Sequence, residues 1–208
     1  MWEIMRAAFR GNFKSCWKKK KEPICNHCSL SLEMSGSVEQ VKDKDLKRRV
    51  QELTCCPGVS TFFMHRHPPH NCPRLSPHWL TLHVKYAKRQ PFSFEVRILD
   101  DTDTIRRFWF STYTDTRVTT YLTRVPLQLA RGWHIVQVNL AEFTEKTYGT
   151  TYLETLRVQV HGNCRLHQIF FSDCKYSDHD LTQRLRAGPK YRILRPIPPD
   201  HETNLYLD

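Results

Sequence analysis

Strict alternation of apolar and polar residues is the feature that most constrains the fold of this chain. The segments Trp79–Tyr86 and Phe92–Leu99 show it most clearly. Their apolar residues at every second position are Leu80, Leu82, Val84, Tyr86, Phe92, Phe94, Val96 and Ile98. Because successive side chains of a strand point to opposite faces of a sheet, this pattern predicts antiparallel strands with one buried and one polar face.

Similar segments recur along the chain and are separated by turn residues, such as the aspartates of Leu99–Arg107 and the pair Gly162-Asn163. The expected strands are Leu46–Cys55, Val59–His65, Trp79–Tyr86, Phe92–Leu99, Arg106–Thr112, Val118–Leu129, Trp133–Leu140, Tyr152–His161 and Arg165–Ser172. Many short strands at near-regular spacing predict an all-β sandwich or barrel.

Only two short helices are expected, and both are marked by capping residues. One covers about Ala141–Thr147 and is ended by Gly149. The other follows Ser177, where Ser177 or Asp178 caps the first turn.

The chain divides by composition into three parts. Residues 1–37 are expected to form an irregular basic arm, 38–187 the β-sandwich domain, and 188–208 an extended, proline-containing tail. Such a tail is ordered only where it lies against other parts of the protein.

Charge indicates the kind of partner. Lysine and arginine number 32 against 21 acidic residues, a formal net charge of +11. This excess favours a nucleic acid, an anionic membrane or an acidic protein lattice such as tubulin. The sign of the charge does not choose among them. The sequence has no stretch of about 18 uncharged apolar residues, so no membrane span is expected, and a membrane is not among the expected partners.

The beginning of the chain does not resemble a secretory signal, because Arg6 and Arg10 interrupt the region that should be apolar. A mitochondrial presequence and a basic arm that lies on a partner are both consistent with it. Without secretion, the eight cysteines are expected to be free thiols or metal ligands rather than disulfides.

Four residues are candidate zinc ligands: Cys25, Cys28, His65 and His67. The spacing fits no standard zinc finger, and the alternative is scattered thiols beside a histidine-rich loop. The aspartates of Asp100–Asp103 could bind calcium or form a solvated turn. The nucleophile, metalloprotease and phosphate-loop signatures of common enzymes are missing, so no enzymatic activity and no cofactor are expected.

Basic and aromatic residues alternate in the stretch Ile105–Val118. On a strand, Arg107, Trp109 and Tyr113 share one face while Phe108 and Phe110 share the other. One aromatic set must belong to the core. The other is either a docking surface, for which a nucleic acid is an alternative partner, or a second packed layer.

A series of short motifs between residues 79 and 181 resembles the cilia- and flagella-associated protein 20 family. The matching motifs are Leu99–Asp101, Arg106–Phe108, Gly132-Trp133, Asn139-Leu140, Phe143-Thr144, Tyr148–Tyr152, Glu154–Gln159, Asn163–Arg165, Phe171–Asp173 and Tyr176-Ser177. The likeness is thinner before residue 79, where Phe9–Phe13, the turn at 42–46 and residues 59–61 match, and the segments around Cys25 and His65 and the tail depart from the family pattern.

The resemblance implies a jelly-roll-like antiparallel β-sandwich without enzymatic activity. It implies a microtubule inner protein that bridges A- and B-tubule protofilaments at the inner junction of ciliary doublet microtubules. The implied partners are tubulin, a Parkin-coregulated-type protein and other microtubule inner proteins. The implied location is the cytoskeleton of the cilium or flagellum, namely the axoneme, with the basal body and the sperm tail as specialised settings.

A contact set follows from that role together with the charge pattern. Basic and aromatic residues expected to touch partners are Phe9, Phe13, Arg106, Arg107, Arg117, Lys146, Tyr148, Arg157 and Arg165. For each arginine the alternative is a solvated strand face, and for Tyr148 it is packing within a loop. A nucleic-acid-binding module and a carbohydrate-binding module are the alternative functions.

Overall fold

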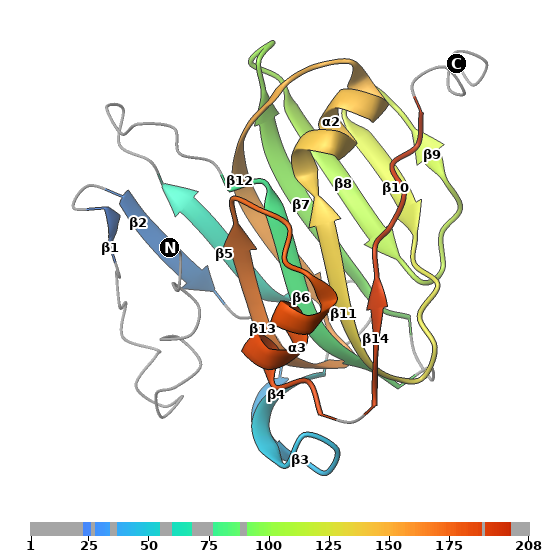
Figure 1. Cartoon of the computed structure of the whole chain (residues 1–208). Coiled ribbons are helices and arrows are strands. Elements are labelled where there is room, and N and C mark those ends of the chain that lie inside the picture. The colour runs from blue at the N-terminus through green and yellow to red at the C-terminus, as the bar shows by residue number, and fades with distance from the viewer. Residues whose placement is uncertain are drawn as a thin grey trace.

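Two β-sheets stacked face to face form the body of the molecule in this computed structural model (Figure 1). The structure describes residues 38–54, 77–87, 91–188 and 190–200 in full, and it gives the strand backbone at 23–25, 28–33, 37 and 60–67. The expected all-β sandwich with short helices is confirmed. No helix in these ranges is long and apolar enough to cross a membrane.

Sheet A has eight strands. In spatial order they are β1 (Pro23–Cys25), β2 (Cys28–Glu33), β5 (Ser60–His67), β12 (Tyr152–His161), β7 (Ser93–Asp100), β8 (Ile105–Ser111), β10 (Leu122–Pro126) and β9 (Arg117–Val118). All neighbours are antiparallel except β8 and β10, which are parallel.

Sheet B has six strands. In spatial order they are β14 (Tyr191–Leu194), β11 (Gly132–Asn139), β6 (Trp79–Tyr86), β13 (Cys164–Ser172), β4 (Arg48–Thr54) and β3 (Ser37–Asp43). Here too one pair is parallel, β11 with β14. The expected antiparallel sandwich thus contains two parallel pairs, where the chain reaches the sheet through a loop or a helix rather than a hairpin.

The core lies between the two sheets and is built by the alternating residues. Its largest fully buried rings are Phe92, Phe94, Phe108, Phe110 and Phe143. Phe94 and Phe110 stack with ring centroids 4.6 Å apart. Burial of this apolar surface is the main source of stability in such a fold.

Helix α2 (Leu140–Tyr148) covers one end of the sandwich (Figure 1). The side chain of Asn139 caps its first turn by accepting from the backbone N–H of Glu142. Gly149 ends it in the left-handed conformation with φ of 67° and donates its N–H to the carbonyl of Glu145. This helix and its glycine stop are as predicted.

Helix α3 (Asp178–Leu185) packs on the outer face of sheet B. The Ser177 side chain accepts from the N–H of Asp180, so Ser177, and not the alternative Asp178, caps the helix. Leu181 and Leu185 pack with Ile135 and Phe170 of the sheet. Sheet B therefore has apolar contacts on both faces.

The expected strand Val118–Leu129 is wrong as one element. Thr119 breaks it, because its N–H and hydroxyl both donate to the carbonyl of Leu122 and reverse the chain between β9 and β10. The expected strand Leu46–Cys55 begins later, at Arg48, since Asp43 closes a turn before it by accepting from the N–H groups of Asp45 and Leu46.

Both terminal segments contain strands that were not expected. β1, β2 and the start of β3 lie within the arm expected to be irregular. In the tail, β14 pairs with β11, and the carbonyl of Pro199 accepts from the hydroxyl of Thr147 on α2. The tail through Asp200 therefore lies against the sandwich, and contact with the rest of the protein is what an ordered tail requires.

Candidate functional site

The outer face of sheet A carries a group of arginines that we call the arginine face: Arg97, Arg107, Arg117, Arg124 and Arg157. Three of them are directly opposed across adjacent strands, since Arg97 pairs with Arg157 on one side and with Arg107 on the other. At the edge of the sheet, Arg124 of β10 pairs with Arg117 of β9. The inner face of the same strands holds core residues, so alternation alone places these side chains outward.

Glu95 is the anion at the centre of this face. Arg97 Nε donates to its Oε1 at 2.8 Å, and Arg107 Nη2 donates to its Oε2 at 2.6 Å. Burial favours the protonated form of this carboxyl, but the hydrogen bonds from Arg107 and Arg97 outweigh burial and lower the pKa of Glu95. Glu95 is thus an ionised carboxylate held between two guanidinium groups.

An aromatic pair borders the same face. Trp109 of β8 and His161 of β12 stack over the intervening strand β7, with ring centroids 5.5 Å apart and an interplanar angle of 9°. Ser93 of β7 is the cross-strand partner of His161, and its small side chain leaves room for the rings. Of the two aromatic sets between which the sequence did not choose, Phe108 and Phe110 form the core, and Arg107 and Trp109 lie on the opposite face.

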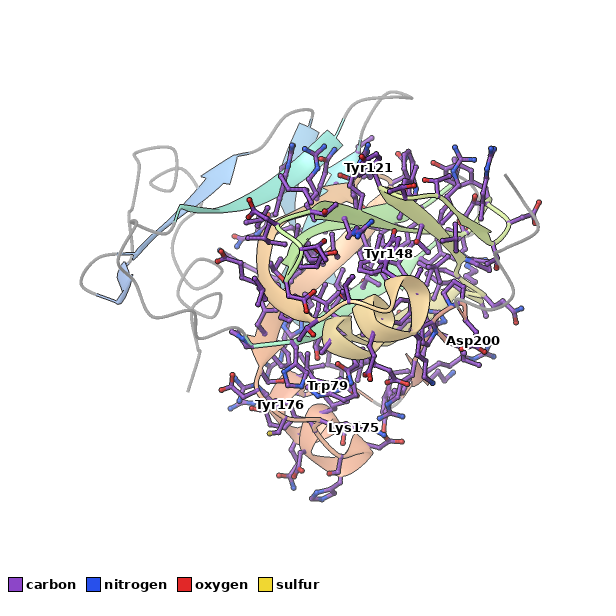
Figure 2. The ribbon with its side chains drawn as sticks, turned by 90° about the horizontal axis from the view of Figure 1, so that it is seen from above. Trp79, Tyr121, Tyr148, Lys175, Tyr176 and Asp200 are labelled. Atoms are coloured by element: carbon purple, nitrogen blue, oxygen red, sulfur yellow. The ribbon has the colours of Figure 1, made fainter. Side chains whose placement is uncertain are left out.

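Arg106 and Tyr148 meet at the end of the sandwich near α2 rather than on the arginine face. The Arg106 guanidinium lies 4.5 Å from the Tyr148 ring centroid, and its Nε donates to Asp100 Oδ2 at 2.7 Å. Figure 2 shows Tyr148 between α2 and the strands of sheet A. Burial raises the pKa of Tyr148 to about 12, so its hydroxyl stays protonated beside the hydroxyl of Thr123 at 2.6 Å.

Both carboxylate oxygens of Asp100 accept hydrogen bonds from other residues of the protein. Its Oδ1 accepts from the hydroxyl of Thr102 and the N–H of Thr104, while Oδ2 accepts from Arg106 and Thr150. This carboxylate, the first of the aspartate run considered for calcium, therefore organises the β7–β8 turn. Within the fully described ranges, no group of three or more candidate metal ligands occurs.

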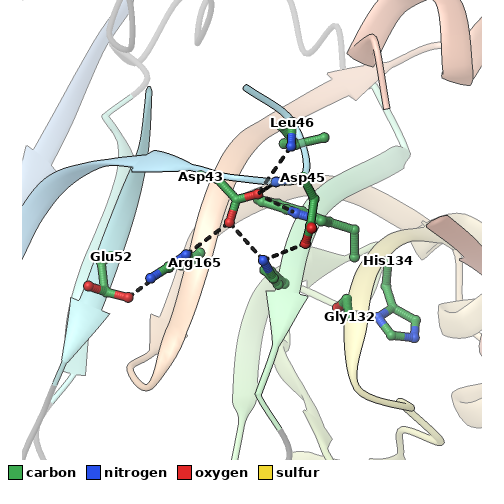
Figure 3. A network of polar contacts seen from close by, with 9 residues as sticks. Asp43, Asp45, Leu46, Glu52, Gly132, His134 and Arg165 are labelled. Atoms are coloured by element: carbon green, nitrogen blue, oxygen red, sulfur yellow. Dashed lines mark hydrogen bonds and ion pairs between the residues drawn. The ribbon is translucent and has the colours of Figure 1, made fainter. Parts of the chain in front are cut away.

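Arg165 belongs to a polar network on the outer side of sheet B (Figure 3). Its Nη1 donates to Asp43 at 2.9 Å and its Nε to Glu52 at 2.7 Å. Asp43 is fully buried and also binds Lys85 Nζ at 2.8 Å and Trp133 Nε1 at 3.1 Å. Burial opposes its charge, but hydrogen bonds from Lys85 and Arg165 hold the pKa of Asp43 well below its usual range.

Two buried histidines lie next to this network. His83 Nδ1 and His167 Nδ1 are 2.9 Å apart, so one ring donates and the other accepts. The His83 ring lies 4.7 Å from the Trp133 ring. Burial and the neighbouring His167 lower the pKa of His83 to about 3, and burial lowers the pKa of His167 to about 4.

Of the remaining expected contact residues, the structure describes Lys146. Lys146 is half exposed on α2, where it pairs with Glu142 at 3.1 Å. Phe9 and Phe13 lie outside the described residues, and so do the side chains of the four candidate zinc ligands Cys25, Cys28, His65 and His67. The zinc prediction and the predicted contacts of the arm therefore stay predictions.

The structure brings Arg107, Arg117 and Arg157 of the expected set onto one face and adds Arg97 and Arg124, which sequence reasoning missed. Their signal was present in the alternation, because residues 95 and 97 are the polar positions between Phe94, Val96 and Ile98. Register between strands, which the sequence did not supply, was needed to align them.

Comparison with known proteins gives one consistent result. The CFA20 domain matches residues 4–188. Cilia- and flagella-associated protein 20 of Paramecium tetraurelia is 35% identical over 164 residues, which are 78% of this chain and 82% of the relative. The protein of that name from Chlamydomonas reinhardtii is 38% identical over 71% of this chain and 77% of its own length. The protein of that name from Caenorhabditis elegans is 34% identical over 71% of this chain and 72% of its own length.

Proposed function

Because the chain belongs to the CFA20 domain family, we propose that it is a non-enzymatic structural protein of the cilium or flagellum. In this proposal it sits inside axonemal doublet microtubules and bridges A- and B-tubule protofilaments at the inner junction. Its partners there are tubulin and a Parkin-coregulated-type protein. The match to the CFA20 domain over residues 4–188 is the single observation that carries the proposal.

The architecture supports a role in which the protein resists mechanical shear. Two sheets share one continuous core, and two buried carboxylates, Asp43 and Asp100, fasten separate strands and turns to one another. Packed interiors of this kind resist deformation, since side chains interdigitate at crystal-like density. A unit that bridges neighbouring protofilaments needs this resistance to shear.

Charge supports an acidic partner. The chain carries a formal net charge of +11, and the arginine face places part of that charge on exposed strand positions of sheet A. Complementary charge mainly speeds and orients association. In a repeating lattice each bound copy also holds its neighbours at high local concentration, so individual contacts need only modest affinity.

The test is the location of the full chain in ciliated or flagellated cells. After detergent extraction, we expect a tagged protein to stay with the axoneme and to resist moderate salt. A density map of native doublets should then contain the two-sheet body at the inner junction. Loss of the protein with the detergent-soluble fraction, or density at another site, would refute the bridging role.

A further inference from the structure

We propose that the arginine face binds an extended, glutamate-rich polypeptide segment of a partner protein. The face comprises Arg97, Arg107, Arg117, Arg124 and Arg157. The inference deepens the proposed function and rests on it in one respect, because the segment is taken to belong to a component of the same assembly. The contact itself is argued from the geometry of sheet A.

The first argument is an energetic cost that the sheet bears. Like charges directly opposite each other on neighbouring strands are destabilising. Sheet A contains three such contacts, Arg157–Arg97, Arg97–Arg107 and Arg124–Arg117. Glu95 offsets the repulsion between Arg97 and Arg107 within the fold, whereas Arg117 and Arg124 form no ion pair among the described residues. Departures from local rules of this kind are expected where a surface serves binding.

The second argument is that the face has too few acids of its own. On β7, β8, β9, β10 and β12, the strands that carry the five arginines, the acidic residues of this face are Glu95 and Glu154. Arg117 and Arg124 are exposed at the β9–β10 edge. An external anion would offset the repulsion among the guanidinium groups.

The third argument is that Glu95 shows how these arginines hold a carboxylate. Each guanidinium has five N–H donors, and Glu95 accepts one hydrogen bond from Arg97 and one from Arg107. The side chains of Arg97 and Arg107 remain 37% and 36% exposed while they hold Glu95. Donors therefore remain for a second carboxylate, and the planar fork of arginine suits that shape.

The spacing fits an extended polypeptide. Adjacent strands lie about 4.8 Å apart, so Arg157 and Arg107, two strands apart, are separated by roughly 10 Å. Alternate residues of an extended chain lie about 7 Å apart and point to the same side. A segment crossing the strands with glutamates at every second position would place successive carboxylates within reach of the long arginine side chains.

A nucleic acid is the less favoured occupant. Non-specific single-strand binding depends on aromatic faces on which bases stack. On this surface Trp109 already stacks on His161. Arginine does bind phosphate, so an oligonucleotide is included in the test as a competing ligand.

The experiment uses the purified full chain and a fluorescein-labelled peptide of alternating glutamate and serine. Anisotropy is measured at 50 and 200 mM NaCl, and a peptide with glutamine in place of glutamate is the uncharged probe. We expect saturable binding of the acidic peptide that weakens with salt, and no binding of the glutamine peptide. Absence of binding at 50 mM NaCl would overturn the proposal.

Charge-reversal variants locate the site. Arg124→Glu and Arg117→Glu should each weaken binding at least about 5-fold, as expected from loss of roughly 1 kcal/mol per exposed charge contact. Arg192→Glu on β14 is the matched control, because it makes the same charge change at an exposed position of sheet B. Glu95→Gln should strengthen binding, since it releases two guanidinium groups.

Three outcomes decide against the proposal. Equal losses in Arg124→Glu and Arg192→Glu would mean a non-specific response to net charge. Tighter binding of a single-stranded oligonucleotide at the same salt would assign the face to nucleic acid. A face occupied by another segment of this chain would show as peptide binding only after that segment is removed.

The result is separable from that of the proposed function. If the wild-type chain stays with axonemes but does not bind the acidic peptide, only the arginine-face proposal fails. If it binds the peptide through Arg124 but is absent from axonemes, the bridging role fails and the surface assignment stands. Melting curves of the variants check folding. Arg117→Glu and Arg124→Glu should keep or raise the melting temperature, because each removes a like-charge pair at an exposed position. Glu95→Gln should lower it, because Glu95 is 3% exposed and holds two ion pairs, so its binding is measured well below its melting temperature.

Discussion

Replacing Asp43 with asparagine tests how much the buried ion-pair network contributes to the stability of sheet B. The substitution keeps the shape of the side chain and an oxygen that can accept from the N–H groups of Asp45 and Leu46. It removes the charge that pairs with Lys85 at 2.8 Å and Arg165 at 2.9 Å. The variant therefore isolates the ionic contribution from the turn geometry.

The expected loss follows from the burial of the partners. Breaking a fully buried ion pair by removing one member costs about 3–5 kcal/mol, because the other charge is left uncompensated. Lys85 and Arg165 keep 23% and 32% of their side-chain surface exposed, so water relieves part of that cost. We expect a loss of about 2–3 kcal/mol, and roughly 2–4 °C per kcal/mol gives a fall in melting temperature of about 4–12 °C.

Urea titration of the purified chain, followed by tryptophan fluorescence, measures this loss. Asp45→Asn is the matched control, because Asp45 binds the same Lys85 at 2.6 Å from a side chain that is 54% exposed. An exposed pair contributes less than about 1 kcal/mol. If the two variants lose the same stability, burial of the charge at Asp43 does not have the effect argued here.

Two further predictions concern a buried titration and a helix stop. The lowered pKa values of His83 and His167, about 3 and about 4, mean that the unfolded chain binds more protons than the folded chain below about pH 6.5. Stability should therefore fall as the pH drops from 6.5 towards 4, and urea titrations of His167→Gln should show a shallower fall; an unchanged slope would contradict this origin. Gly149→Ala should destabilise the protein by about 1–2 kcal/mol, because an L-residue at φ of 67° is strained; a melting temperature equal to that of the wild type would show that this turn relaxes freely.

The body of the sandwich could be predicted because the alternation that marks each strand is visible in its own residues. Trp79–Tyr86 and Tyr152–His161 have the predicted bounds, since each alternates cleanly and is flanked by turn residues. Thr119 was missed because a threonine hydroxyl can close a turn within a run of strand-forming residues, without glycine, proline or asparagine to mark it. β14 was missed because its pairing depends on a distant partner strand.

The types of residue in the site could be predicted from the sequence, but their positions relative to one another could not. Charge and alternation indicated outward arginines, but Arg106 and Arg107 follow each other in sequence and play different parts. Arg107 faces outward beside Glu95, whereas Arg106 is 8% exposed and holds Asp100. Which arginine is available to a partner depends on the carboxylate it meets, and that is a tertiary property.

The short strand β14 also bears on where this protein can be cut. The match to the CFA20 domain stops at residue 188, yet Tyr191–Leu194 complete the edge of sheet B, and Arg195 continues the attachment by donating to Gln137 at 3.0 Å. A truncation placed at the family boundary would leave the backbone of β11 unpaired along that edge. An open edge of this kind recruits strands from other molecules, so the shortened protein would gain a route to aggregation that the longer chain blocks.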